Sequence, residues 1–398
     1  MIIQLNKKMN ILSSLGIMLV VAGHTGFTFL DWFPIFSFHM ALFMFISGYF
    51  FKDRTFKSFI RNKIYHLLIP LLLWNALYGI VINFLADNGM TQLYHKSISL
   101  QSLLWDPFTM GWQFNFNAPT WFVGTLFLVQ VIYWGLYRGS GKKMMLIWMS
   151  VIALHIFSLY MAFHGWAQYH DLDAWSNVKL GVARALFCLM FYHLGHIYHI
   201  YFEEKDIFSL DKIVGLFILN AFLIGFVSPQ IWMDVRPMYF PVHKYWLPLV
   251  EACSGIWLFL QIASLLQQHV KEESLIHYIG RHTFAIMTHQ QFFFWILNTM
   301  IFGLTYFNVY KLSSFNYDLY MKDIYYRIEA HPPVNQLLYL IAGVMGPIIC
   351  CWIYERYIKM HIANICLNMK SSIIAIKYYV RGGAKVINME VKVGCYAG

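Results

Sequence analysis

Two histidines interrupt long apolar stretches near the start of the chain, where ionisable side chains are uncommon. His24 lies in the stretch Asn10–Leu30, and His39 lies near the start of the next one, Phe33–Phe51. Ionisable groups in such stretches are costly, so they usually face a bundle interior or a wet cavity. A neutral imidazole can take a proton from a hydroxyl near neutral pH. Both histidines are therefore candidate catalytic residues.

The first apolar stretch carries small residues that suit close helix packing. Gly16 and Gly23 allow neighbouring helices to approach, which leaves the imidazole of His24 turned toward protein. The short Asp31–Pro34 hinge brings the start of the second stretch beside the end of the first, so the two histidines could share one cavity. Two alternatives stay open. His24 could be a structural histidine bonded to a backbone carbonyl, and His39 could simply be solvated.

A basic cluster follows the second apolar stretch. It consists of Lys57, Arg61, Lys63 and His66, and the last two share a helix face because they are three residues apart. Such a cluster can hold the phosphates of a nucleotide-type donor through charge-assisted hydrogen bonds. These four residues are therefore candidate cofactor-binding residues. The cluster could equally be no more than the positive charge that cytoplasmic loops retain.

The composition places these residues in an integral membrane protein. Hydrophobic residues make up 59% of the 398-residue chain and charged residues 12%, against about a quarter charged in soluble domains. The chain therefore has too little polar surface to cover itself in water. Its formal net charge of +10 does not come from basic runs interleaved with stacking aromatics, which argues against a nucleic-acid partner and for basic cytoplasmic loops.

Segments of membrane-spanning length recur along the chain. We predict an all-α, polytopic helical bundle with about ten transmembrane helices, each of roughly 20 mostly apolar residues. The predicted boundaries are Asn10–Leu30, Phe33–Phe51, Ile64–Leu85, Thr120–Tyr137, Met144–Phe163, Lys179–Ile200, Lys212–Val227, Leu247–Leu266, Phe284–Leu304 and Val334–Tyr357. Basic residues gather on one side if these spans alternate, which places both termini in the cytoplasm.

Two connections on the opposite side are long. Ala86–Pro119 and Thr305–Pro333 are rich in Trp, Tyr, Asn and Gln and poor in basic residues, which suits sugar binding, although an interfacial aromatic belt is the alternative. We predict one transmembrane domain, residues 1–360, and a cytoplasmic C-terminal tail, residues 361–398. No pair of the six cysteines has the spacing of a zinc site, so no metal is predicted.

Five motifs occur in a recognisable order. They are VVAGHTGF, FSFHMALFMFISGYFF, a basic segment ending in HLLIP, PTWFVGTLFLVQ and IGRHTFAIMTHQ. From about Lys8 to about Tyr357, this ordered set resembles the membrane-bound acyltransferase-3 family, with its usual number of about ten spans. These proteins are acyl-CoA-dependent O-acyltransferases that modify cell-surface polysaccharides, mostly with acetyl groups.

The resemblance implies a donor, an acceptor and further site residues. The donor would be cytoplasmic acetyl-CoA, and the acceptor a sugar hydroxyl of a surface polysaccharide, an exopolysaccharide or a lipid-linked oligosaccharide, with the protein embedded in the lipids of the plasma membrane. His24 falls on the family's essential first-helix histidine. Ser47, Trp121 and His289 fall on its Ser-Gly pair, its Trp-Phe pair and its late histidine. These three are therefore candidate substrate-binding or oxyanion-binding residues.

The sequence departs from the family pattern at two places. Many members carry an arginine eleven residues before the first-helix histidine, where this chain has Ser13, and an Arg-x-x-Arg pair where this chain has Lys63 and His66. Both changes weaken a bidentate clamp on phosphate or acyl groups, because lysine and arginine are not equivalent there. The donor-binding residues are therefore less well specified than His24.

The favoured mechanism is direct transfer with His24 as general base, and an acyl-enzyme relay stays open. A proton-coupled transporter of a polar solute and a polytopic lipid acyltransferase are the alternative functions. Among the acidic residues only Glu251 lies clearly inside a predicted span, whereas proton-coupled carriers tend to use Asp or Glu. The polar aromatic loops favour a sugar over a lipid acceptor.

Overall fold

The apolar segments fold as helices, because a helix satisfies its backbone hydrogen bonds within one segment, as a lipid environment requires. The computed structural model describes residues 6–25, 35–90, 98–109, 114–164, 174–227, 245–307, 309, 315–328 and 334–359. Within these ranges every regular element is helical and no strand occurs, so the predicted all-α class is confirmed for this part of the chain. The predicted Asp31–Pro34 hinge and the tail 361–398 lie outside the described residues.

Each of the ten predicted apolar segments contains a helix in the structure. These helices are α1 (Lys7–His24), α2 (Ile35–Tyr49), α4 (Ile69–Asp87), α6 (Trp121–Gly139), α7 (Met144–Phe163), α8 (Ala174–Ile197), α9 (Leu210–Phe222), α10 (Leu247–Leu266), α12 (Thr283–Tyr306) and α14 (Val334–Ile353). Shorter helices lie between them: α3 (Phe56–Lys63), α5 (Asp106–Thr109), α11 (Leu275–Arg281) and α13 (Tyr317–Lys322). The long connections predicted on one side therefore contain α5 and α13.

Seven helical stretches of the described chain are long and apolar enough to cross a membrane. They are Phe56–Asp87, Phe116–Gly139, Met144–Phe163, Asn177–Lys205, Leu210–Val227, Leu247–Leu266 and Asn335–Lys359. Several of them run on into π-helical turns, such as Ile64–Leu68 between α3 and α4. The larger predicted number of spans and the cytoplasmic location of both termini stay predictions.

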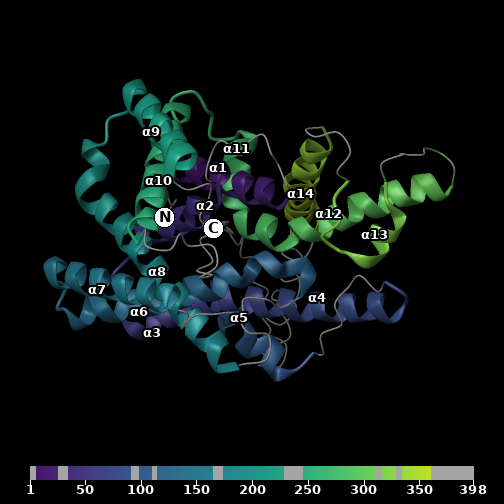
Figure 1. The fold of residues 1–398 in the computed structure, drawn as a ribbon, viewed down its shortest axis with the longest axis horizontal. Helices are drawn as coiled ribbons and strands as arrows, with labels where there is room; N and C mark the ends of the chain where they lie inside the picture. Colours follow the sequence, from purple (N-terminus) through teal and green to yellow (C-terminus); the bar gives the residue numbers. More distant parts are fainter. Residues whose placement is uncertain are drawn as a thin grey trace, which may run out of the picture.

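Helices α1, α2 and α12 are less apolar or shorter than these seven for a structural reason. Helix α1 packs against α2, α10, α11, α12 and α14, and Figure 1 shows α1 and α2 in the middle of the bundle. Helices surrounded by protein can carry polar side chains that lipid would exclude. Accordingly, α1 buries Asn10, Ser13 and Ser14, and α12 buries Gln291 and Asn298.

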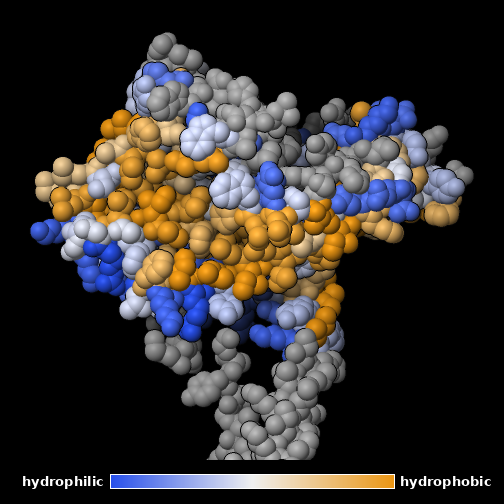
Figure 2. Space-filling model, turned by 90° about the horizontal axis from the view of Figure 1, so that it is seen from below, coloured by the Kyte–Doolittle hydropathy of each residue, from blue (hydrophilic) through white to orange (hydrophobic). Residues whose placement is uncertain are grey.

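The outer surface of the bundle is apolar where lipid would surround it. Figure 2 shows a broad band of hydrophobic residues across one face, with hydrophilic residues on both sides of the band. Large side chains such as Leu73, Phe84, Met145 and Phe217 are exposed. An exposed apolar belt of this extent is unfavourable in water and favourable in a bilayer. The protein is therefore a membrane protein.

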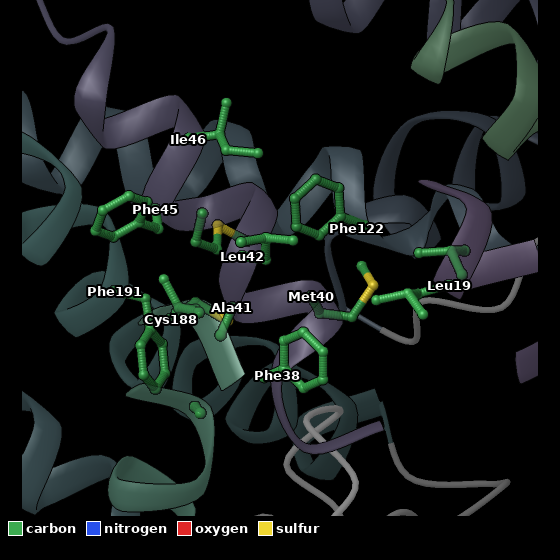
Figure 3. Packing of buried hydrophobic residues seen from close by; sticks show 14 of the residues in the cluster. Leu19, Phe38, Met40, Ala41, Leu42, Phe45, Ile46, Phe122, Cys188 and Phe191 are labelled. Carbon is green, nitrogen blue, oxygen red and sulfur yellow. The ribbon is translucent and has the colours of Figure 1, made fainter. Parts of the chain in front are cut away.

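The tightest helix pair is α2 against α8. A Cβ atom added at Gly48 of α2 would overlap the backbone carbonyl of Tyr192, and one added at Gly195 of α8 would overlap the carbonyl of Phe45. The two backbones thus approach as closely as glycine permits. Figure 3 shows buried side chains of both helices packed together, among them Phe45 of α2 and Phe191 of α8. This crossing holds α2, and with it His39 and Ser47.

A buried ion pair fixes the first turn of α1 to the rest of the bundle. The ammonium group of Lys8 lies 3.1 Å from a carboxylate oxygen of Asp206, with side-chain exposures of 9% and 2%. The same carboxylate accepts hydrogen bonds from Tyr198 at 2.8 Å and from Gln261 at 2.7 Å. Burial by itself raises the pKa of Asp206, but these hydrogen bonds and the Lys8 charge together hold it below its ordinary value.

We expect Asp206→Ala to lower the free energy of unfolding by about 3 kcal/mol, because it leaves Lys8 buried without its carboxylate. Thermal unfolding of the purified protein in detergent measures this. Glu272→Ala is the matched control, since Glu272 pairs with Lys7 on the surface and exposed pairs contribute up to about 1 kcal/mol. The double variant Lys8→Met/Asp206→Leu should lose less free energy of unfolding than the two single variants lose together.

The same carboxylate gives stability a dependence on pH. Because its pKa is lower in the folded protein than in the unfolded chain, its contribution is complete above the unfolded pKa of about 3.9 and is lost as pH falls through the folded value. The loss of stability between pH 5 and pH 3 should therefore be smaller in Asp206→Ala than in the wild type. Equal losses in both proteins would contradict the assignment.

Candidate active site

A cavity of about 600 Å³ lies between α1, α2, α6 and α12. Most of its wall is apolar, for example Ile17, Phe43 and Met287. Its polar lining residues are Ser13, His24, His39, Ser47, Trp121, Thr283, Gln291 and Tyr325. The cavity therefore combines a dry wall with a few convergent polar groups, as small-molecule sites commonly do.

The cavity follows α1 lengthwise. Ser13, Ile17, Val20 and His24 all line it, and their spacing of three or four residues puts them on one helix face. The eleven residues from Ser13 to His24 correspond to roughly 16 Å along the helix. Helix α2 runs antiparallel to α1, since Gly23 lies against the Phe36 side chain and Gly16 against that of Phe43. His24 and His39 are thus at one end of the cavity, and Ser13 and Ser47 at the other.

The two histidines of the cavity differ in their exposure and hydrogen bonding. His24 ends α1 and is exposed to the cavity that it lines. His39 is buried, and its Nδ1 lies 2.6 Å from the carbonyl oxygen of Ile35. Because a carbonyl oxygen only accepts hydrogen bonds, Nδ1 of neutral His39 carries the proton and Nε2 is its basic nitrogen. His24 lies within electrostatic range of both the His39 imidazole and the Arg327 guanidinium group, so the three groups are close in space.

Ser47 and Trp121 also lie on the cavity wall, and each is held by a residue behind it. Gln130 of α6 donates a hydrogen bond of 2.8 Å to the hydroxyl oxygen of Ser47. The guanidinium group of the buried Arg184 lies 4.7 Å from the centre of the Trp121 ring, a cation–π distance. Both side chains are therefore fixed by neighbours outside the cavity.

The basic cluster lies beside the cavity rather than in it. None of Lys57, Arg61, Lys63 and His66 lines the wall. The chain from Ile64 to Leu68 forms a π-helical turn. The spacing of an α-helix, from which Lys63 and His66 were expected to share a face, therefore does not hold there. Leu67, four residues after Lys63, is the residue of this turn on the cavity wall. Phe59 of α3 stacks on Trp134 of α6, one helical turn after the Gln130 that holds Ser47, so the cluster adjoins the Ser47 end of the cavity.

The structure does not place His289 on the cavity wall. Its Nδ1 lies 2.6 Å from the hydroxyl group of Tyr78, and its ring meets that of Trp74 edge-on with centroids 4.3 Å apart. These partners belong to α4, on the other side of α12. Gln291 of the same helix lines the cavity instead. Each residue turns an α-helix by about 100°, so two residues that are two apart point to nearly opposite sides.

Three residues near the histidine end of the cavity are not predicted from the sequence. Gln291 and Tyr325 line the cavity, and Arg327 donates a hydrogen bond of 2.6 Å to the carbonyl oxygen of the Gln291 side chain. Gln291 follows directly on the IGRHTFAIMTHQ motif, and a polar residue within an apolar helix was the available signal. Tyr325 and Arg327 come from the predicted sugar-binding connection and had no motif to mark them.

Two guanidinium groups lie just behind the wall of the cavity. Among the described residues, its lining contains no Asp, Glu, Lys or Arg side chain, and the two nearby guanidinium groups, Arg184 and Arg327, stand behind Trp121 and Gln291. Charges in such low-dielectric surroundings act strongly on groups in the cavity. No cluster of His, Cys, Asp and Glu in the described part of the chain is suited to hold a metal ion. The arrangement suits a reaction that develops negative charge on oxygen.

The fold and the cavity define a class of protein: a membrane-embedded helical bundle whose central helices enclose a site with two histidines. The acyltransferase-3 model, described as an acyltransferase domain, matches residues 6–356. The chain therefore belongs to the acyltransferase-3 family, as the order of its motifs predicts, and is a membrane acyltransferase. No curated protein and no solved structure matches the chain.

Proposed function

We propose that this protein moves an acetyl group from cytoplasmic acetyl-CoA to a hydroxyl of a cell-surface or exopolysaccharide sugar. The observation that carries the proposal is the cavity that has two histidines at one end, Ser13 and Ser47 at the other, and no charged side chain among its described lining residues. It follows α1 for roughly 16 Å, so a donor entering at one end and an acceptor at the other can meet inside the bundle.

His24 acts as the general base in this proposal. Its imidazole takes the proton of the acceptor hydroxyl while the hydroxyl oxygen forms a bond to the thioester carbonyl carbon. The carbonyl electron pair moves onto oxygen, which gives a tetrahedral oxyanion. When the oxyanion collapses, the carbon–sulfur bond breaks, and the departing thiolate takes the proton from the imidazolium. The products are the acetyl ester and free CoA, and His24 is neutral again. His39, whose basic nitrogen is Nε2, lies beside His24 at the acceptor end of the cavity.

The charged and aromatic residues near the cavity indicate which end binds the donor and which end binds the acceptor. Lys57, Arg61, Lys63 and His66 adjoin the Ser47 end through the π turn, where basic groups would hold the phosphates of CoA. The acceptor end carries Trp121 and the loop residue Tyr325, and rings of this kind stack on sugars. The plasma membrane location and the cytoplasmic position of the basic cluster belong to this proposal.

An acyl-transfer assay tests the function directly. The purified protein is placed in liposomes with radiolabelled acetyl-CoA and a panel of polysaccharides and lipid-linked oligosaccharides, and labelled ester is measured. In cells, proton NMR of the surface polysaccharide compares acetyl content with and without the gene. We expect label in a sugar ester and loss of acetyl groups without the gene. Label found only in lipid, or solute flux without any transfer, would contradict the proposal.

A further inference from the structure

The side-chain amide of Gln291 has a fixed orientation at the histidine end of the cavity. Gln291 is 3% exposed and lines the cavity, and its Oε1 accepts a hydrogen bond of 2.6 Å from the Arg327 guanidinium group. Oxygen and nitrogen of an amide are often interchangeable in a structure. Here the choice is forced, because a guanidinium group only donates. The oxygen must face Arg327, so the amide nitrogen faces away from it.

Arg327 is held rigidly enough to impose this orientation. It donates to the carbonyl oxygen of Tyr326 at 2.8 Å, and its guanidinium group lies 4.5 Å from the ring centre of Phe294 and 5.4 Å from that of Tyr339. Tyr339 is itself hydrogen-bonded to Asn298. No carboxylate of the described residues forms an ion pair with Arg327. The Asp323 carboxylate acts on this guanidinium group from beyond ion-pair distance, and the hydrogen bond to Gln291 carries the polarising effect of Arg327 to the cavity.

The amide nitrogen of Gln291 has no hydrogen-bond partner among the described residues, although the side chain is almost entirely buried. The nitrogen is not among the fully buried side-chain atoms that lack a partner, so it is accessible from the cavity that Gln291 lines, where a ligand can accept its hydrogen bond. The neighbouring Gln290 differs, because it does not line the cavity and its amide nitrogen donates to the carbonyl of Met287 at 3.3 Å.

We propose that the amide nitrogen of Gln291 donates a hydrogen bond to the thioester carbonyl oxygen as it becomes the oxyanion, and that Arg327 is the positioning residue that aims and polarises this amide. The inference rests on the proposed acyl transfer and adds the oxyanion-binding group to it. The hydrogen bond strengthens as the carbon–oxygen double bond opens, so it favours the transition state over bound substrate.

The test compares two variants of Gln291 with a matched control in the reconstituted acyl-transfer assay. Gln291→Glu keeps an acceptor for Arg327 but removes the donor, and Gln291→Met removes both. We expect both to lower kcat by about 100-fold to 1,000-fold with the KM for acetyl-CoA unchanged and thermal unfolding within a few degrees of wild type. The control Gln290→Met should keep kcat within about threefold.

The positioning role of Arg327 is tested by combining its replacement with that of Gln291, and not by the single replacement alone. Arg327→Met should lower kcat by about tenfold, and the double variant Gln291→Met/Arg327→Met should be no slower than Gln291→Met, because a positioning residue has nothing left to position. Additive losses would contradict the positioning role. Wild-type kcat in both Gln291 variants, or equal losses of kcat and thermal stability in the Gln290 and Gln291 variants, would overturn the oxyanion assignment.

The outcome also separates this inference from the proposed function. If the wild-type protein transfers no acyl group, the proposed function is wrong and the oxyanion assignment is wrong with it. If His24→Gln abolishes transfer while both Gln291 variants retain the wild-type kcat, the proposed function stands and only the role of Gln291 is wrong.

Discussion

Replacing His24 by glutamine is expected to reduce acyl transfer by about 100-fold to 10,000-fold, because the variant keeps the size and polarity of the side chain but removes the base. His24 lines the cavity, and no carboxylate of the described lining is present to replace it. The loss should appear in kcat with little change in the KM for acetyl-CoA, since proton removal occurs only in the transition state. Initial rates with labelled acetyl-CoA measure both constants.

Folding controls make this result interpretable. His24→Gln should elute as a single species in detergent and unfold at the wild-type temperature, because His24 is at the last turn of α1 and faces the cavity. His164→Gln serves as the matched histidine control: it ends α7, away from the cavity, and contacts its own helix through the carbonyl of Tyr160. Transfer at the wild-type rate in His24→Gln, or equal losses in both variants, would show that His24 is not the base.

Replacing Gly195 or Gly48 by alanine is expected to have the largest effect on stability. Each added methyl group would overlap a backbone carbonyl oxygen of the opposite helix, that of Phe45 or Tyr192. Backbone cannot move aside as a side chain can, so the cost should reach about 3 kcal/mol or more, the upper part of the range for overpacking. Thermal unfolding in detergent and the yield of monodisperse protein measure the loss.

The matched control is Gly135→Ala in α6, where an added Cβ atom meets nothing within 4 Å. Alanine is favoured over glycine in a helix by about 1 kcal/mol, so this variant should be as stable as wild type or slightly more stable. Activity adds a second readout, because separating α2 from α8 displaces His39 and Ser47 from the cavity wall. If Gly48→Ala and Gly135→Ala unfold at the same temperature, the close crossing of α2 and α8 is not required.

The sequence by itself was sufficient to identify the membrane class and the family. Apolar runs of spanning length predict helices because the requirement to satisfy backbone hydrogen bonds in lipid acts within each segment. Every predicted run contains a helix, including α7 and α10 with the predicted boundaries. His24 and His39 stood out for the same local reason, since an ionisable group in an apolar run needs an explanation. Both line the cavity.

Only the tertiary structure decided which face of each helix meets the cavity. Helix α12 is polar on more than one side, so its sequence pattern does not fix its rotation, and packing against α4 turns His289 toward Tyr78 and Gln291 toward the cavity. The partners that fix the site are distant in sequence: Gln130 meets Ser47 across 83 positions. Arg327 meets Gln291 across 36 positions. Helix formation is local and readable from spacing, whereas these contacts depend on how whole helices pack.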